Sequence, residues 1–336
     1  MQNFDPFYNN LPKAEIHCHL EGAIRTATIL ELSNTHNLPL PTRDPRELDR
    51  HVKVHQQMSG LQPVLDAFAI AQNSLVSAAA VERIALELFE DAARQNVRLF
   101  ELRFSPDWAF RSHNLDWDEA LEALLRAQAD AQVRYGMAIG LIAITSRSLG
   151  SQSAERTVDW AIRHRAHICG IDLADGERDY PIALFLEPVR RAQEAGLKVT
   201  IHSGEDTPAA TVMETIRLAN PDRIGHGIHI IEDMAAVELV IQRGITLETN
   251  PWSNYLTHSV EGIEDHPLKR LFDLGVRVTI NSDDPELLDT NLNNEYRIAH
   301  EVLGMTVEEI AQCNRFAVES SFLPAATRAS VQARFF

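Results

Sequence analysis

The 336-residue sequence predicts an α/β protein, a closed (β/α)8 TIM barrel formed by a single domain over residues 1–336. Short apolar runs alternate with longer amphipathic runs eight times along the chain, as in repeated strand–helix units. No stretch is typical of a linker, and α/β barrels often run past about 250 residues as one domain. The alternative is an open doubly wound sheet, but no G-x-G-x-x-G follows any predicted strand.

The eight expected strands are short apolar runs that end at polar or turn-forming residues. They cover Ala14–His19, Val97–Glu101, Met137–Ile144, Ile168–Leu173, Lys198–His202, Arg223–His226, Ile245–Glu248 and Arg277–Asn281.

The expected helices have apolar residues at helical spacing, and several end at a glycine. They cover 23–35, Leu48–Ser77 with an interruption at Gly60–Pro63, Ala78–Gln95, Leu115–Tyr135, Ala154–His164, Leu184–Glu194, Ala209–Leu218, Asp233–Arg243, Pro267–Leu274, Leu292–Gly304 and Val307–Ala317. Extra helices are therefore expected after the first strand and at the C-terminus.

The composition narrows the choice of partners and compartment. A formal charge of −17 disfavours nucleic-acid backbones and anionic membranes as partners, but not a neutral base or nucleoside. Three cysteines without C-x-x-C spacing indicate a reducing compartment. The first ten residues lack the apolar core of a signal peptide, and no window is apolar enough for a membrane span. We expect a cytoplasmic protein, and the oligomeric state stays open.

Polar residues gather where the predicted strands end, which is where barrel enzymes place their catalytic groups. His17 and His19 share a face of the first strand, although such a pair is more often an ordinary surface or core pair. His202 ends the fifth strand, and Asp283 follows the eighth, which neighbours the first in a closed barrel. Three imidazoles and one carboxylate suit a single Zn²⁺ that activates a water.

Three further residues are candidates for proton transfer or substrate contact. Glu205, in a turn after His202, can deliver a proton if a dry site raises its pKa, but can also be a solvated loop residue. His226 suits a general base or a clamp on the hydroxide, although its flanking glycines can equally serve only a tight turn. Asp284 can face the substrate or simply begin a helix before Pro285.

Five ordered motifs between about residues 11 and 325 resemble those of the adenosine/adenine deaminase family. They are His17-Cys18-His19-Leu20-Glu21-Gly22-Ala23, Gly170-Ile171-Asp172-Leu173-Ala174, His202-Ser203-Gly204-Glu205, Arg223-Ile224-Gly225-His226-Gly227 and Asn281-Ser282-Asp283-Asp284-Pro285. The resemblance implies a hydrolase that deaminates an aminopurine nucleoside at C6, turning adenosine or 2′-deoxyadenosine into inosine or 2′-deoxyinosine plus ammonia in purine salvage.

The same resemblance implies a role for each matching residue. One Zn²⁺ per subunit would be bound by His17, His19, His202 and Asp283. Glu205 would protonate the ring N1, His226 would orient the hydroxide and act as base, and Asp284 would accept a hydrogen bond from N7. Asp172 and Ser253 would support these groups from behind.

The sequence specifies the substrate less narrowly than it specifies the reaction. Glu101-Leu102-Arg103-Phe104-Ser105-Pro106 and Asn250-Pro251-Trp252-Ser253-Asn254-Tyr255-Leu256-Thr257 are similar to the adenosine branch of the family. In that branch Leu61, Val64 and Phe68 match an apolar lid, although alone they indicate only the core face of a helix.

Two departures leave adenine or another aminated purine or heterocycle as alternative substrates. Glu21 replaces an Asp that reaches the ribose 5′-hydroxyl, and Glu at this position is familiar from adenine deaminases. Asp175 replaces a glycine whose backbone meets purine N3, so its side chain would crowd or re-aim the base edge.

Two other functions are alternatives. A binuclear amidohydrolase needs a bridging carboxylated lysine after the fourth strand, but Ile168–Glu177 contains no lysine. A catalytically inactive relative that binds or signals would not need the complete set of ligands, acid and base.

Overall fold

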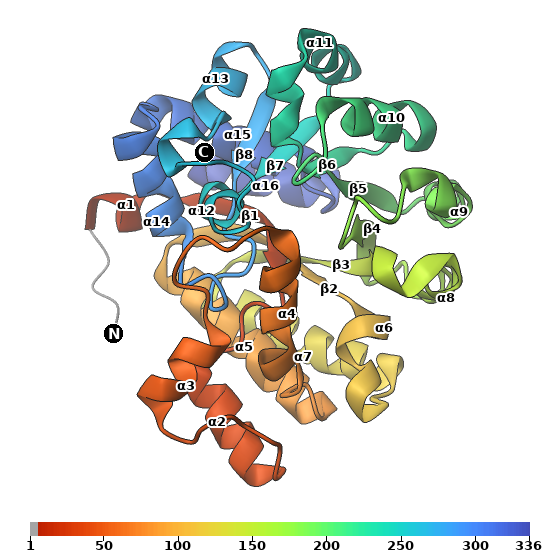
Figure 1. Ribbon diagram of the computed structural model, residues 1–336, viewed down its shortest axis with the longest axis vertical. Coiled ribbons are helices and arrows are strands. Elements are labelled where there is room, and N and C mark those ends of the chain that lie inside the picture. Colours follow the sequence, from red (N-terminus) through yellow and green to blue (C-terminus); the bar gives the residue numbers. More distant parts are fainter. Residues whose placement is uncertain (1–5) are drawn as a thin grey trace.

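The computed structural model describes residues 6–336 and contains one sheet of eight parallel strands in the order β1 to β8 (Figure 1). The strands are β1 (Lys13–His19), β2 (Val97–Phe104), β3 (Ala138–Ser146), β4 (Ile168–Ala174), β5 (Lys198–Ser203), β6 (Arg223–His226), β7 (Thr246–Thr249) and β8 (Arg277–Ile280).

The sheet closes between β1 and the residues that follow β8. The Asp283 amide donates to the His17 carbonyl at 3.0 Å, and the His19 amide donates to the Asp283 carbonyl at 2.9 Å. These two bonds bring the polar residues after β8 beside the end of β1. The (β/α)8 barrel predicted from the sequence is therefore confirmed.

Helices surround the barrel and cover its outer face (Figure 1). They are α1 (Pro6–Asn10), α2 (Thr26–Thr35), α3 (Pro45–Val52), α4 (Leu61–Gln72), α5 (Ala78–Arg94), α6 (Pro106–Ala109), α7 (Trp117–Tyr135), α8 (Gly150–Arg163), α9 (Leu186–Glu194), α10 (Ala209–Ala219), α11 (Met234–Arg243), α12 (Pro251–Leu256), α13 (Leu268–Asp273), α14 (Leu292–Arg297), α15 (Val307–Ser320) and α16 (Ala325–Phe335). No helix within residues 6–336 is both long and apolar enough to cross a membrane.

Local sequence explains where several of these helices begin and end. The Asp116 side chain accepts from two backbone amides at the start of α7, and Gly136 ends that helix in the left-handed conformation. Thr306 and Glu309 form a reciprocal capping box at the start of α15. These caps satisfy backbone groups that the helix itself leaves unpaired.

The predicted helix over Leu48–Ser77, interrupted at Gly60–Pro63, was wrong in its boundaries. The break covers residues 53–60 instead, and Pro63 lies in the first turn of α4, where a helical residue needs no amide donor. The predicted Leu292–Gly304 helix is also not uniform, since α14 continues as a π-helical turn over Ile298–Val302. The short helices α6 and α12 and the terminal helices α1 and α16 were missed.

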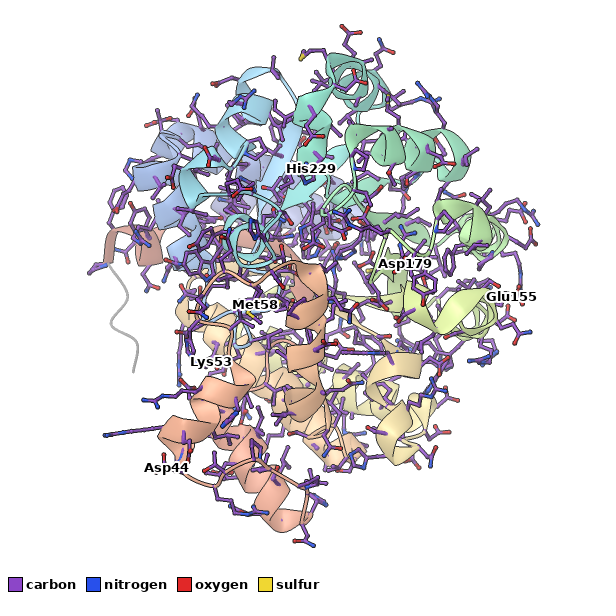
Figure 2. All side chains as sticks on the ribbon, viewed as in Figure 1. Asp44, Lys53, Met58, Glu155, Asp179 and His229 are labelled. Atoms are coloured by element: carbon purple, nitrogen blue, oxygen red, sulfur yellow. The ribbon has the colours of Figure 1, made fainter. Side chains whose placement is uncertain are left out.

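Helix α4 packs over the barrel end where β1 and β8 terminate. Val64 and Phe68 of α4 are buried in an apolar cluster with Leu256 and Leu288. Backbone hydrogen bonds fix the position of the segment before α4, which carries Lys53 and Met58 (Figure 2). The Met58 amide donates to the Leu256 carbonyl at 2.8 Å. This helix therefore forms a wall at the mouth of the barrel.

Candidate active site at the carboxyl end of the barrel

Four imidazoles, of which three are buried and His19 is partly exposed, converge at the end of the barrel where the strands terminate. The ring centroids of His17 and His202 are 4.7 Å apart, and those of His17 and His226 are 5.1 Å apart. His19 Nε2 lies 3.4 Å from His17 Nε2 and 3.2 Å from Asp283 Oδ1. The sequence predicted His17, His19, His202 and Asp283 as neighbours, and the structure brings them together.

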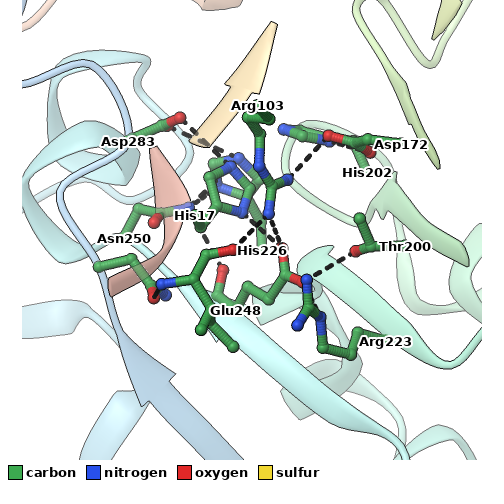
Figure 3. Close-up of polar contacts among 12 residues, drawn as sticks. His17, Arg103, Asp172, Thr200, His202, Arg223, His226, Glu248, Asn250 and Asp283 are labelled. Carbon is green, nitrogen blue, oxygen red and sulfur yellow. Dashed lines mark hydrogen bonds and ion pairs between the residues drawn. The ribbon is translucent and has the colours of Figure 1, made fainter. Parts of the chain in front are cut away.

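Carboxylates orient two of these rings from behind (Figure 3). His17 Nδ1 lies 2.7 Å from Glu248 Oε2, and His202 Nδ1 lies 3.0 Å from Asp172 Oδ1. A carboxylate only accepts here, so Nδ1 carries the hydrogen and Nε2 of each ring keeps its lone pair for the centre of the site. Asp172 thus lies where the sequence placed it.

Buried arginines hold these carboxylates in place. Arg103 donates to Asp172 Oδ2 at 2.7 Å and to Glu248 Oε2 at 2.8 Å. Arg223 Nε lies 2.5 Å from Glu248 Oε1 (Figure 3). Although burial opposes a charge on Glu248, the two guanidinium groups hold the pKa of this carboxyl well below its usual value. The barrel interior is thus a fixed polar support for the imidazoles.

Two glycines leave space that the site requires. A Cβ on Gly225 would lie 3.1 Å from His202 Nδ1 and 3.2 Å from the His17 ring. A Cβ on Gly22 would lie 1.9 Å from Asp284 Oδ1. Gly225 therefore lets the rings approach one another, and Gly22 lets Asp284 reach the cavity. Gly227, with φ +70°, serves the turn after β6.

The donor atoms match the spacing of ligands around a small divalent metal. His17 Nε2 lies 3.3 Å from Asp283 Oδ1, and both lie within 3.4 Å of His19 Nε2. Tetrahedral ligands about 2.1 Å from Zn²⁺ are spaced about 3.4 Å apart. Burial lowers the pKa of His19 to about 4, which favours the neutral imidazole that a metal needs. The residues therefore fit a metal ion.

Two overlapping sets of four residues can be drawn around this point. One comprises His17, His202, His226 and Asp283, whose ligand atoms lie within 4.8 Å of one another. The other replaces His226 with His19. We favour the set with His19, because His226 Nδ1 faces the amide nitrogens of Asn254 at 2.9 Å and Asn250 at 3.2 Å. These contacts place the hydrogen of His226 on Nε2, which removes that lone pair.

Glu205 is buried in a loop that Glu177 holds in place. The Gly204 and Glu205 amides donate to the two carboxylate oxygens of Glu177 at 2.7 and 3.0 Å. Glu205 Oε2 lies 3.6 Å from His226 Nε2. Burial, together with the negative charges of Asp283 and Glu177, raises the pKa of Glu205 well above its usual value. Glu205 is therefore suited to hold a proton near neutral pH.

Asp284 and Glu21 bring two further carboxyl groups to the cavity. Glu21 Oε1 accepts from the Ser105 amide at 2.7 Å. Within the described residues, Glu21 Oε2 and Asp284 Oδ1 find no hydrogen-bond partner although both are buried. Burial raises the pKa of Glu21 to about 7 and, with the charges of Asp283 and Glu21, that of Asp284 well above its usual value. Both groups can therefore make a hydrogen bond to a substrate.

A cavity of about 250 Å³ joins these groups to an apolar wall. Leu61, Val64 and Phe68 from α4 line it, as expected for a lid, together with Trp108. Ser253 also lines the cavity itself, whereas the sequence predicted that it would support the catalytic groups from behind.

Asp175 forms another part of the cavity wall. It has φ +82°, and its carboxylate accepts from the Ser146 hydroxyl at 2.6 Å and from the Ser148 hydroxyl. These bonds hold the Asp175 side chain in the wall of the cavity.

Sequence reasoning missed the residues that orient the site from behind. Glu248 ends a predicted strand, so the strand-end criterion applied to the other strands could have identified it. Asn254 lies within a stretch that resembles the adenosine branch, and Glu177 lies shortly after the fourth strand, but the sequence assigned neither residue a role. His266, whose Nε2 lies 3.0 Å from Asn254 Oδ1, precedes α13 and has no local signal. Only tertiary contacts identify it.

Comparisons with known proteins agree with this site. A family model described as adenosine deaminase matches residues 12–335. An adenosine deaminase of Erwinia tasmaniensis is 35% identical over 326 residues, which cover 97% of this chain and 98% of that protein.

Three solved structures share the fold. An adenine deaminase from Arthrobacter aurescens is 28% identical, with a TM-score of 0.90 and coverage of 96% and 97% of the two chains. An amidohydrolase from Burkholderia ambifaria with bound Zn is 28% identical, with a TM-score of 0.90 and coverage of 98% and 90%. An N6-mAMP deaminase of Arabidopsis is 25% identical, with a TM-score of 0.87 and coverage of 98% and 99%.

Proposed function

The chain belongs to the adenosine deaminase family, and from this premise we propose that it is a zinc-dependent hydrolase that removes the 6-amino group of a neutral aminopurine nucleoside. Adenosine and 2′-deoxyadenosine are the proposed substrates, and the role is purine salvage. The observation that carries the proposal is the convergence of three imidazoles and Asp283 beside the buried acid Glu205. Free thiols at Cys18, Cys169 and Cys313 support a cytoplasmic location.

His17, His19, His202 and Asp283 would hold one zinc ion per subunit. When bound, zinc supplies the Lewis acidity that brings the pKa of a water close to neutral. His17 and His202 are held by carboxylates so that Nε2 faces the centre. Zinc is supported by this donor set and by the relative from Burkholderia ambifaria, which was solved with bound Zn.

Glu205, His226 and Asp284 would act on the purine ring and on the attacking water. Glu205, a carboxyl that burial keeps protonated, would donate to ring N1 and make C6 more electrophilic. His226 Nε2, which lies 3.6 Å from Glu205 Oε2 and 3.8 Å from Asp283 Oδ2, would orient the water that attacks C6. Asp284 would contact N7. Because N7 of a nucleoside carries no hydrogen, Asp284 must donate this bond as the neutral acid, rather than accept it.

The charge of the cavity favours a neutral substrate over a nucleotide. Among the described residues that line it there are six carboxyl groups and no lysine or arginine. The family resemblance places Glu21 near the 5′ end of a ribose, so a 5′-phosphate would meet a carboxyl group without a cation. Glu21, whose pKa burial raises to about 7, can become neutral, but a buried phosphate with no lysine or arginine beside it still costs several kcal/mol. The relative from Arabidopsis is an N6-mAMP deaminase, and we propose that this chain differs from it in this respect.

A substrate panel tests the proposal. The zinc-loaded protein is incubated with adenosine, 2′-deoxyadenosine, adenine and AMP, and ammonia release is measured for each. We expect kcat/KM for adenosine to exceed that for AMP by at least about 100-fold, because the cavity offers no cation to the 5′-phosphate. A preference for AMP would overturn the neutral-substrate proposal, and no ammonia from any of the four would overturn deamination.

Glu21 also favours a second candidate substrate, free adenine. Its Oε2 is buried and unpartnered within residues 6–336, and can accept from a ribose hydroxyl or equally from a ring N–H of adenine. The relative from Arthrobacter aurescens is an adenine deaminase. In the same panel, a higher kcat/KM for adenine than for adenosine would select this alternative.

A further inference from the structure

Two side-chain amide groups contact the His226 ring. Asn254 Nδ2 lies 2.9 Å from Nδ1, whereas Asn250 Nδ2 lies 3.2 Å from Nδ1 and 3.4 Å from Nε2, so Asn254 makes the contact that is specific to Nδ1. An amide NH₂ group only donates, so Nδ1 must accept when the NH₂ end of the asparagine amide faces it. The hydrogen of a neutral His226 ring then sits on Nε2, the atom that faces Glu205 and Asp283.

Backbone groups, whose donor and acceptor roles are fixed, settle both amide orientations. Asn250 Nδ2 donates to the Glu248 carbonyl at 3.2 Å. The Leu268 amide donates to His266 Nδ1 at 3.2 Å, so His266 must carry its hydrogen on Nε2. His266 Nε2 lies 3.0 Å from Asn254 Oδ1, which must therefore accept and turn its NH₂ toward His226. A chain of hydrogen bonds thus runs from a backbone amide to the site.

We propose that Asn254 and His266 are positioning residues that fix His226 as an Nε2–H donor, so that His226 holds the oxygen of the attacking water and does not take its proton. Once Glu205 has given its proton to ring N1, its carboxylate takes the proton of the water and passes it to the departing amino group. The proton of the new C6 hydroxyl then returns to Glu205 as ammonia leaves. The inference rests on the proposed function and deepens it. It departs from the role of general base that the family resemblance implied for His226. His17 and His202, which are held at Nδ1 by carboxylates, carry the opposite tautomer.

The surroundings keep the hydrogen-bonded side chains of His226, Asn254 and His266 uncharged. His226, Asn254 and His266 are all buried. Burial lowers the pKa of His266 to about 3, so it stays uncharged and donates from Nε2 only. Protonation of His226 on Nδ1 would direct an N–H at the NH₂ group of Asn254, which the structure opposes. The Nε2–H is therefore retained while the water attacks and negative charge develops on its oxygen.

Nitrogen NMR of the zinc-loaded protein labelled with ¹⁵N-histidine reads the tautomers directly, without any turnover. The His226 signals are assigned by their loss in His226→Gln. We expect protonated Nε2 and unprotonated Nδ1 at His226, with the reverse at His17 and His202 as an internal control. A hydrogen on Nδ1 of His226 overturns the proposal. Because no substrate is present, this result is independent of whether adenosine is deaminated.

A matched pair of substitutions tests the consequence for catalysis. In Asn254→Asp the carboxylate accepts from both histidines and moves the His226 hydrogen to Nδ1. We expect zinc content to be retained and kcat to fall by about 10²–10³, the effect of losing one preorganised donor. If His226 were a base, the freed Nε2 lone pair would maintain or raise kcat, and that result overturns the donor role.

The partner substitution, His266→Gln, preserves the chain. The glutamine amide can accept from the Leu268 amide and donate to Asn254 Oδ1, so the His226 tautomer should be unchanged and kcat within a few-fold of the parent. A shift of the His226 hydrogen to Nδ1 in this variant would show that the direction of the hydrogen bond between residue 266 and Asn254 does not set the His226 tautomer. If Asn254→Asp fails to fold, the spectrum of the unsubstituted protein still decides the proposal.

Discussion

Replacing Glu205 by glutamine separates proton transfer from every other role of this residue. The two side chains have nearly the same shape, and burial with the nearby charges of Asp283 and Glu177 already favours the uncharged carboxyl. The substitution therefore changes neither the charge nor the volume of the site at neutral pH. The glutamine NH₂ can still donate a hydrogen bond to ring N1, but it cannot transfer its proton.

The expected effect falls on kcat. A positioned general acid contributes about 10²–10⁴ in rate, which corresponds to about 2.7–5.4 kcal/mol of transition-state stabilisation. KM should change by less than about tenfold, because the ground-state hydrogen bond to N1 is retained. Zinc content and the free energy of unfolding should match the parent, since Glu177 still holds the loop through the backbone amides of Gly204 and residue 205.

Steady-state ammonia release from adenosine gives kcat and KM, and elemental analysis gives zinc content. Asp206→Asn is the matched control. Its carboxylate is next in the chain but pairs with the exposed Arg178 at 2.9 Å, and such surface pairs contribute little, so kcat should stay within about twofold. A Glu205→Gln protein that binds zinc normally and keeps kcat within tenfold of the parent would refute the assignment of Glu205 as the acid.

Three further predictions concern the metal, the cavity wall and stability. His17→Ala should weaken zinc binding by more than about 100-fold, measured by competition with a chelator, whereas substitution of the partly exposed His229 by alanine should not; equal affinities would contradict the ligand set. Exchanging the order at 175–176 (Asp175→Gly with Gly176→Asp) should raise kcat/KM for adenosine, because the carboxylate leaves the cavity wall, and an unchanged value would discard that account of specificity. His266 has a folded pKa of about 3 against 6.5 in the unfolded chain, so its contribution is present above pH 6.5 and is lost as the pH falls. Between pH 6.5 and 5 urea unfolding should show about 2 kcal/mol more loss for the parent than for His266→Gln, and parallel curves would contradict the neutral buried ring.

The sequence was informative wherever function depends on strand ends. His17, His202 and Asp283 are far apart in the chain but follow apolar runs, and closure of a parallel barrel brings such positions together without further information. The same criterion would have identified Glu248. The helical wall at Val64 and Phe68 was identified by the family resemblance, since its apolar spacing alone predicts only the core face of a helix.

Other features depend on contacts that no local pattern encodes. The boundaries of α3 and α4 are set partly by backbone hydrogen bonds from Val54 to Leu287, in the loop after β8, and from Met58 to Leu256, at the end of α12. Likewise His266 gains its role only because the loop before α13 packs against Asn254. The direction of a hydrogen bond at His226 follows from that packing. Protonation states and tautomers of this kind require coordinates of the neighbouring groups.

The central claim is tested most directly by ammonia release from adenosine before chelation, after chelation, and after zinc is restored. We predict one ammonia and one inosine per adenosine consumed, loss of both when the protein is stripped of metal, and recovery with one equivalent of zinc per subunit. Activity that persists in the metal-free protein, or a zinc-loaded protein that releases no ammonia from adenosine, would contradict the claim.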